Sequence, residues 1–74
     1  MDPLHLLRSL VPGSRVVVRY RIDDGLTDAL GDLLEIGEST CTVRTRRDDV
    51  FVPLAAVTAA RAVPPPPPRR SRAL

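Results

Sequence analysis

The sequence predicts a small all-β fold, a barrel of five short strands preceded by one short helix. A chain of 74 residues and 8.1 kDa holds at most one small domain. After residue 13, short segments alternate apolar and polar residues with a period of two, and clusters that favour tight turns separate them. A domain of about 60 residues buries only about 60% of its unfolded surface, so we expect a stability of a few kcal/mol.

The first segment, residues 1–12, is predicted to be helical. Asp2 supplies a side-chain acceptor for the helix N-terminus, and Pro3 occupies the first helical position, where no backbone donor is needed. Pro12 and Gly13 stop the helix. Two turns are marginally stable alone, so this helix must pack on the sheet or fray. Its apolar stripe consists of Leu4, Leu7 and Val11.

The first two strands are predicted at residues 14–22 and 27–36. Asp23-Asp24-Gly25 lies between them and favours a tight hairpin turn. In the second strand Gly31 has no side chain to pack, so we expect a bulge or a close backbone contact there. The inward face of the second strand therefore stays unassigned.

The remaining strands are shorter. A turn at 37–39 leads to a third strand at 41–46, and a turn at 47–49 leads to a fourth at 50–52, which Pro53 ends because it cannot donate to a ladder. Residues 54–57 suit one 3₁₀ turn, and residues 58–63 form the last strand.

This order of elements is the layout of an SH3-like barrel spanning residues 13–63, in which the strands curl until both sheet edges meet. The expected core consists of Val16, Val18, Tyr20, Ile22, Leu33, Ile36, Cys41, Val43, Val50, Val52, Val57 and Ala59. Residues 64–74 form a separate tail. Five consecutive prolines predict an extended, disordered spacer, and an arginine-rich end follows them.

Charge divides the chain in the same way. Residues 1–61 carry eight Arg and nine Asp or Glu, a net charge of −1, whereas the tail carries three Arg, a net charge of +3. A domain that binds phosphates over its whole surface would itself carry a net positive charge. Six arginines on the strands and turns form the candidate interaction surface: Arg15, Arg19, Arg21, Arg44, Arg46 and Arg47.

Catalytic, cofactor and metal sites are not expected. His5 and Cys41 are single residues of their kinds, too few for a zinc site or a paired nucleophile. The acidic segment 23–32 lacks the spacing of a calcium loop. The two aromatics, Tyr20 and Phe51, cannot build a methyl-lysine cage or a proline-peptide groove. A lone cysteine, together with the absence of a signal-peptide pattern and of a membrane-length apolar run, predicts a cytoplasmic protein.

Four short segments carry a family resemblance. They are Gly13-Ser-Arg-Val-Val-Val-Arg-Tyr-Arg, Leu26-Thr-Asp-Ala-Leu-Gly31, Val43-Arg-Thr-Arg and Val52-Pro-Leu-Ala-Ala-Val57. In this order they resemble the N-terminal SH3-like domain of bacterial GNAT-type, histone acetyltransferase-like N-acetyltransferases. The family's acetyl-CoA loop, Arg/Gln-x-x-Gly-x-Gly/Ala, is missing from this chain. The resemblance therefore implies no catalytic or cofactor residue here.

Two functions remain open at this stage. The resemblance implies a non-catalytic accessory domain that packs on an acetyltransferase domain, in cis or in trans, or recruits its protein substrate. The alternative, less favoured by charge and aromatic content, is a free-standing barrel that binds nucleic acid through its arginine-rich strand faces and tail.

Overall fold

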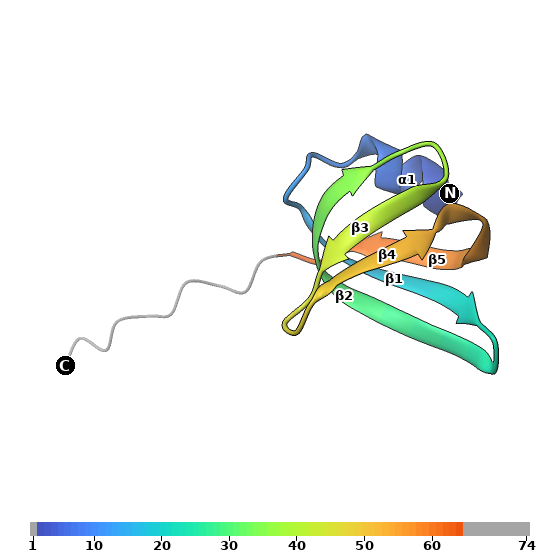
Figure 1. Ribbon diagram of the computed structural model, residues 1–74. Helices are drawn as coiled ribbons and strands as arrows, with labels where there is room; N and C mark the ends of the chain where they lie inside the picture. Colours follow the sequence, from blue (N-terminus) through green and yellow to red (C-terminus); the bar gives the residue numbers. More distant parts are fainter. Residues whose placement is uncertain (1, 65–74) are drawn as a thin grey trace.

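A computed structural model describes residues 2–64, and in this part the chain forms a five-stranded antiparallel sheet with one short helix. The elements are α1 (Pro3–Ser9), β1 (Arg15–Ile22), β2 (Gly25–Ile36), β3 (Thr40–Arg44), β4 (Asp49–Pro53), η1 (Leu54–Ala56) and β5 (Val57–Ala62) (Figure 1). The predicted all-β class with an N-terminal helix is confirmed. The extended, disordered spacer predicted for the tail lies outside the described residues, apart from Pro64.

The sheet is strongly bent but open. Its strand order is β4-β3-β2-β1-β5, so the long β2 is central and β4 and β5 are the two edges. Within residues 2–64 these edges are not paired with each other, and the expectation that they meet is wrong. The short turn η1 instead carries the chain from one edge to the other, held by a hydrogen bond from the backbone N–H of Leu54 to the carbonyl of Ser39 (2.8 Å).

Two irregularities in β2 allow the bend. At Gly31 a β-carbon would overlap the carbonyl oxygen of Arg44 on β3, so only glycine lets the strands approach this closely. A register shift follows between Leu33 and Glu35, where β2 gains one residue over β3. The predicted bulge or close backbone contact around Gly31 is therefore confirmed.

The inner face of the bend holds the core. The register pairs Val16 with Gly31 and Val18 with Ala29, which assigns the inward face of β2 that the sequence left open. Nine buried residues form one cluster: Leu7, Val16, Val18, Ala29, Leu33, Cys41, Val43, Val52 and Leu54. Tyr20, Ile36, Val50 and Val57, also predicted for the core, are partly buried against it.

Two predicted core residues are exposed. Ile22 is 49% exposed because the β1–β2 hairpin extends beyond the last residue of β1, Tyr20, that pairs with β5. Ala59 faces outward because β5 contains one extra residue: Arg19 pairs with Ala59, but Tyr20 pairs with Val57. This bulge reverses the alternation, and Ala60 packs inward instead.

Helix α1 packs on the core instead of fraying. Leu7 is fully buried, and the helix makes its main contacts with β5. The side chain of Asp2 accepts a hydrogen bond from the backbone N–H of Leu4 (3.1 Å), as the capping pattern predicted. The helix ends at Ser9, before the predicted stop, so Val11 leaves the apolar stripe and is 72% exposed.

Candidate functional site

The structure divides the six candidate arginines into two groups. Arg15, Arg19 and Arg21 lie on β1, at positions that alternate with the buried Val16 and Val18. The other three belong to the β3–β4 hairpin. Arg44 is the last residue of β3, and Arg46 and Arg47, predicted at the end of a strand and the start of a turn, both lie in the turn.

Two arginines of the β1 group are held by neighbours within the domain. The Nε of Arg19 donates to Oδ1 of Asp28 on β2 (3.0 Å). This hydrogen bond, with the Coulombic attraction of the same carboxylate, raises the pKa of Arg19. One terminal nitrogen of Arg21 donates to the carbonyl of Ala55 in η1 (3.2 Å). These two side chains therefore have reduced capacity for an external anion.

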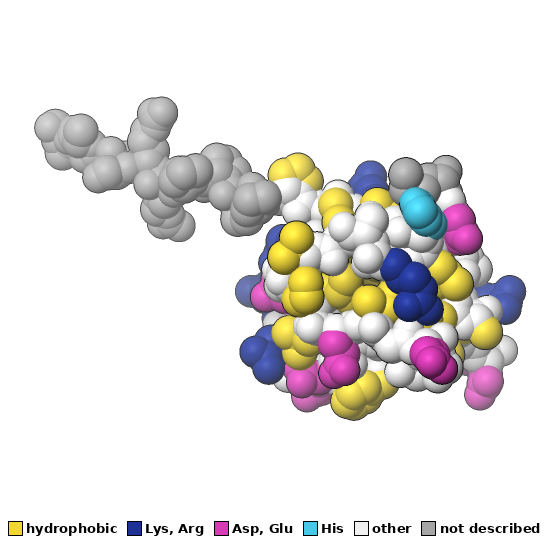
Figure 2. All heavy atoms as spheres, turned by 90° about the horizontal axis from the view of Figure 1, so that it is seen from above, with side chains coloured by type: hydrophobic (Ala, Val, Ile, Leu, Met, Phe, Trp, Pro, Cys, Tyr) yellow, Lys and Arg dark blue, Asp and Glu magenta, His cyan; other side chains and the backbone are white. Residues whose placement is uncertain are grey.

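Acidic residues also neutralise the row that connects the two groups. Across four strands the register aligns Arg15 with Asp32, Asp32 with Arg44, and Arg44 with Asp49. In the last pair, Nε of Arg44 lies 3.2 Å from Oδ1 of Asp49. On the face seen in Figure 2, basic and acidic side chains are likewise interspersed, without a patch of one sign. The sheet surface as a whole thus offers no strong positive field.

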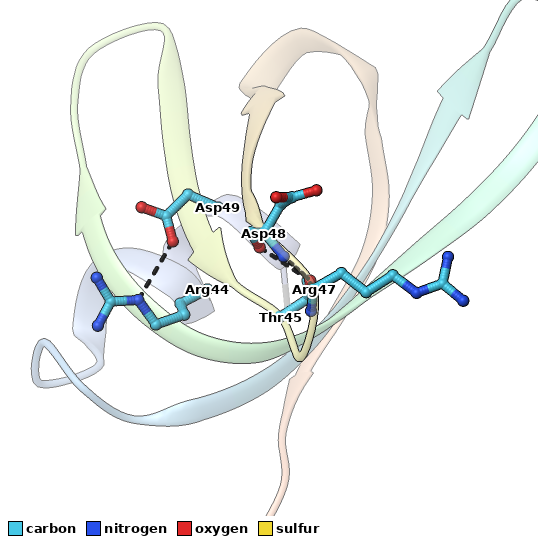
Figure 3. Close-up of polar contacts among 5 residues, drawn as sticks. All are labelled: Arg44, Thr45, Arg47, Asp48 and Asp49. Carbon is cyan, nitrogen blue, oxygen red and sulfur yellow. Dashed lines mark hydrogen bonds and ion pairs between the residues drawn. The ribbon is translucent and has the colours of Figure 1, made fainter.

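The β3–β4 turn differs from the rest of the sheet surface, because hydrogen bonds fix its backbone while its arginine side chains project into solvent. The Thr45 hydroxyl accepts hydrogen bonds from the backbone N–H groups of Arg47 (3.3 Å) and Asp48 (3.2 Å) and donates to the Asp48 carbonyl (2.9 Å). In Figure 3 the side chain of Arg47 points away from the Arg44–Asp49 pair. Arg46 is exposed as well, and neither ion pair found within residues 2–64 involves these two arginines. The turn therefore presents two guanidinium groups to solvent.

An exposed aromatic ring lies on the same hairpin. Phe51 is 69% exposed, and it pairs with Thr42 on β3, two positions along from the pair of Arg44 and Asp49. Phe51 therefore shares a face with Arg44. Phe51 was not among the residues predicted for the candidate surface, although the predicted burial of its neighbour Val52 already places Phe51 on the outward side.

The other residues considered as candidates do not form a site. Cys41 is fully buried, and this burial raises the pKa of its thiol. His5 is exposed on α1. Among residues 2–64 no group of three or more His, Cys, Asp or Glu side chains could hold a metal ion. Asp23 and Asp24 form a tight turn in which Gly25 alone takes a positive φ (148°).

Among residues 2–64, no helix has the length and apolar character that crossing a membrane requires.

Comparison with known proteins gives one match. The family model described as the Rv0428c N-terminal Sm-like domain matches residues 10–61, well over half of the chain. No curated protein and no solved structure gave a significant match. The matched region contains β1 to β4 and all of β5 except its last residue, and its description is that of a small β-domain rather than of a catalytic one.

This match corrects the resemblance drawn from the sequence. The assignment to the SH3-like domain of GNAT-type acetyltransferases is wrong, because the same strands match a different family. Short segments such as Val43-Arg-Thr-Arg are typical of strands in many small barrels and do not distinguish one family from another. The accessory role, and a partner that is an acetyltransferase domain or its substrate, rested on that assignment and have no support.

Proposed function

The chain belongs to the Rv0428c N-terminal Sm-like domain family, and on this basis we propose that it binds single-stranded nucleic acid, RNA in particular. Sm-like domains typically bind nucleic acids or form oligomers. We place the contact on the outer side of the β3–β4 hairpin, within the segment 13–63 that the sequence separates from the helical residues 1–12 and the tail 64–74.

The observation that carries this proposal is the exposed ring of Phe51 beside basic side chains. We call Arg44, Arg46, Arg47 and Phe51 the hairpin patch. Single-stranded nucleic acid is bound where a base can stack on an aromatic ring while cationic groups follow the backbone. Stacking contributes about 1–3 kcal/mol per base and is tolerant of sequence. One ring predicts one stacked base per domain, and hence modest affinity.

The charges of the patch suit this role. Arg44 lies on the same face as Phe51, but its pairing with Asp49 reduces its capacity for an external anion, so the phosphate contacts fall to the turn. Arg46 and Arg47 lie in the turn, and their exposed guanidinium groups can each take a phosphate oxygen. Because residues 1–61 carry a net charge of −1, attraction must come from this local group and not from the domain as a whole.

The test is a titration of fluorescently labelled single-stranded RNA with the full chain at several salt concentrations. Phe51→Ala removes the stacking ring, and we expect about a tenfold loss of affinity, equivalent to about 1.4 kcal/mol. The double variant Arg46→Ala/Arg47→Ala removes two phosphate contacts. It should lower the log–log salt slope by about 1.4, since each contact on a single strand contributes about 0.7.

Matched controls distinguish RNA binding at the hairpin patch from non-specific binding elsewhere on the chain. Arg8→Ala removes an exposed arginine from α1, and Val11→Ala removes an exposed apolar side chain from the α1–β1 connection. Both should leave affinity unchanged. A variant with Arg69, Arg70 and Arg72 replaced by alanine tests the tail. If that variant loses all binding while the patch variants keep it, the contact belongs to the tail and the proposal is wrong.

A further inference from the structure

An acidic side chain lies on the same face of the sheet as the ring of the hairpin patch. Asp49 is the first residue of β4 and Phe51 the third, so both project from the same side of the strand, about 7 Å apart along it. The register places Arg44 opposite Asp49. Beyond this pair the chain enters the turn that carries Arg46 and Arg47. Along the outer side of the hairpin the order is therefore aromatic ring, carboxylate, turn arginines.

The carboxylate of Asp49 has acceptor capacity to spare. Its Oδ1 accepts a hydrogen bond from Nε of Arg44 (3.2 Å), and the side chain is 42% exposed. In the part of the chain that the structure describes, Oδ2 accepts no hydrogen bond, and in Figure 3 this oxygen points away from Arg44. A carboxylate offers about four lone-pair sites. Arg44 thus holds the carboxylate in place and leaves most of its acceptor sites open to a ligand.

A carboxylate in a nucleic-acid site repels the phosphates, so it is favourable only where a hydrogen-bond donor of the ligand meets it. The phosphate oxygens and the bridging oxygens of a strand only accept hydrogen bonds. The donor on the backbone of RNA is the 2′-hydroxyl of ribose, and DNA lacks it. The position of Asp49 is therefore compatible with an RNA strand and unfavourable for a DNA strand.

We propose that Asp49 accepts a hydrogen bond from the 2′-hydroxyl of the nucleotide whose base stacks on Phe51, and that it thereby selects RNA over DNA. This role rests on the proposed binding of single-stranded nucleic acid at the hairpin patch. Within a nucleotide the sugar lies between the base and the phosphate. With the base on Phe51 and the phosphate at Arg46 or Arg47, the sugar lies beside Asp49, and the Watson–Crick edge of the base points away from the turn. Asp49 then recognises the sugar and not the identity of the base.

The test uses three fluorescently labelled oligouridine strands that differ only at the sugar. They are RNA, the corresponding 2′-deoxy strand, and RNA in which fluorine replaces every 2′-hydroxyl. Each is titrated with the full chain and followed by fluorescence anisotropy. We expect RNA to bind about tenfold more tightly than the deoxy strand, the effect of one hydrogen bond to a charged group. Fluorine cannot donate a hydrogen bond, so the fluorinated strand should bind as weakly as the deoxy strand.

Two variants with the same change of charge identify the residue. Asp49→Ala should lower the ratio of RNA to DNA affinity from about ten to about one, because it removes both the acceptor for RNA and the repulsion that disfavours DNA. Asp48→Ala removes an exposed carboxylate from the adjacent turn and keeps the backbone groups that the Thr45 hydroxyl contacts. It should strengthen the binding of both strands alike and leave the ratio unchanged. Circular dichroism checks that each variant is folded.

Equal affinity of the wild-type chain for RNA and DNA overturns this role of Asp49 and leaves the proposed function standing, since both strands then bind. A preference for RNA that persists in Asp49→Ala, or that is lost equally in Asp48→Ala, also overturns it. Absence of binding to all three strands contradicts the proposed function itself, and the role of Asp49 with it. A ratio that falls in Asp49→Ala alone is the result that a merely structural role of the Arg44–Asp49 pair would not give.

Discussion

Gly31 lies directly against the carbonyl oxygen of Arg44, and this contact determines how the domain is built. No β-carbon fits between the two residues. Because Arg44 ends β3 and Gly31 is in the middle of β2, their close approach lets β3 and β4 turn away from β1 and β5. The bend encloses the core on one side. On the other side it separates the hairpin patch from the outer side of β1 and β2.

Gly31→Ala should therefore be strongly destabilising. The methyl group meets backbone, which cannot rotate away as a flexible side chain can, so we expect a loss of about 3 kcal/mol or more from the free energy of unfolding. For a domain of this size such a loss approaches the whole stability. Urea denaturation followed by circular dichroism measures it.

Gly37→Ala is the matched control. A β-carbon at Gly37 would lie 3.5 Å from the carbonyl oxygen of Thr40, an ordinary contact, and Gly37 does not take a positive φ. We expect a change within about 1 kcal/mol. Equal effects of the two substitutions would show that the Gly31–Arg44 contact is not special.

Leu7→Ala tests whether α1 belongs to the core. Leu7 is fully buried, although its helix has only seven residues. Truncation should lower the free energy of unfolding by about 2–5 kcal/mol, since it removes buried methyl groups and leaves a cavity. Thermal unfolding measures the loss. His5→Ala, an exposed change on the same helix, should stay within about 0.5 kcal/mol. A fully stable Leu7→Ala variant would mean that the helix is dispensable.

The buried thiol of Cys41 should make the domain less stable in alkaline solution. Burial raises the pKa of its thiol above the unfolded value of about 8.5. Below that pH both states keep the proton, and the free energy of unfolding is unaffected. Above it the unfolded thiol ionises first, so stability falls by up to about 1.4 kcal/mol per pH unit until the folded thiol also titrates. Denaturation at pH 7 to about 9.5 measures this. Cys41→Ala should remove the slope, and an unchanged slope would assign it to other groups.

Alternation and turn chemistry predicted the existence and order of every element, because both are local properties of the chain. They failed where pairing between strands decides the outcome. The extra residue in β5 reverses the alternation between Val57 and Ala59, and only the partner strand β1 reveals it. Ile22 has the right period for the core, but it lies beyond the residues that β5 covers. Leu54 is buried because the chain crosses there from one edge of the sheet to the other, and no alternation of apolar and polar residues predicts this crossing.

The candidate site was predicted only in part. Counting arginines identified Arg44, Arg46 and Arg47, but it could not separate them from Arg19 and Arg21, whose partners Asp28 on the adjacent strand and Ala55 in η1 come into contact only in the folded chain. Phe51 was not predicted as a binding residue, because an aromatic ring can stack on a base only where the ring is exposed. The buried neighbour Val52 already implied that exposure, and the same alternation that gave the core could have given the ring.

The most direct test of the central claim, that the hairpin patch binds single-stranded nucleic acid, is chemical-shift mapping. Amide spectra of the ¹⁵N-labelled chain are recorded while single-stranded RNA is added. We predict that the largest shifts occur at Arg46, Arg47 and Phe51, with smaller ones at the neighbouring Thr42 and Thr45. Shifts confined to residues 64–74 or to the β1–β2 hairpin, or no shifts at all, would contradict the account.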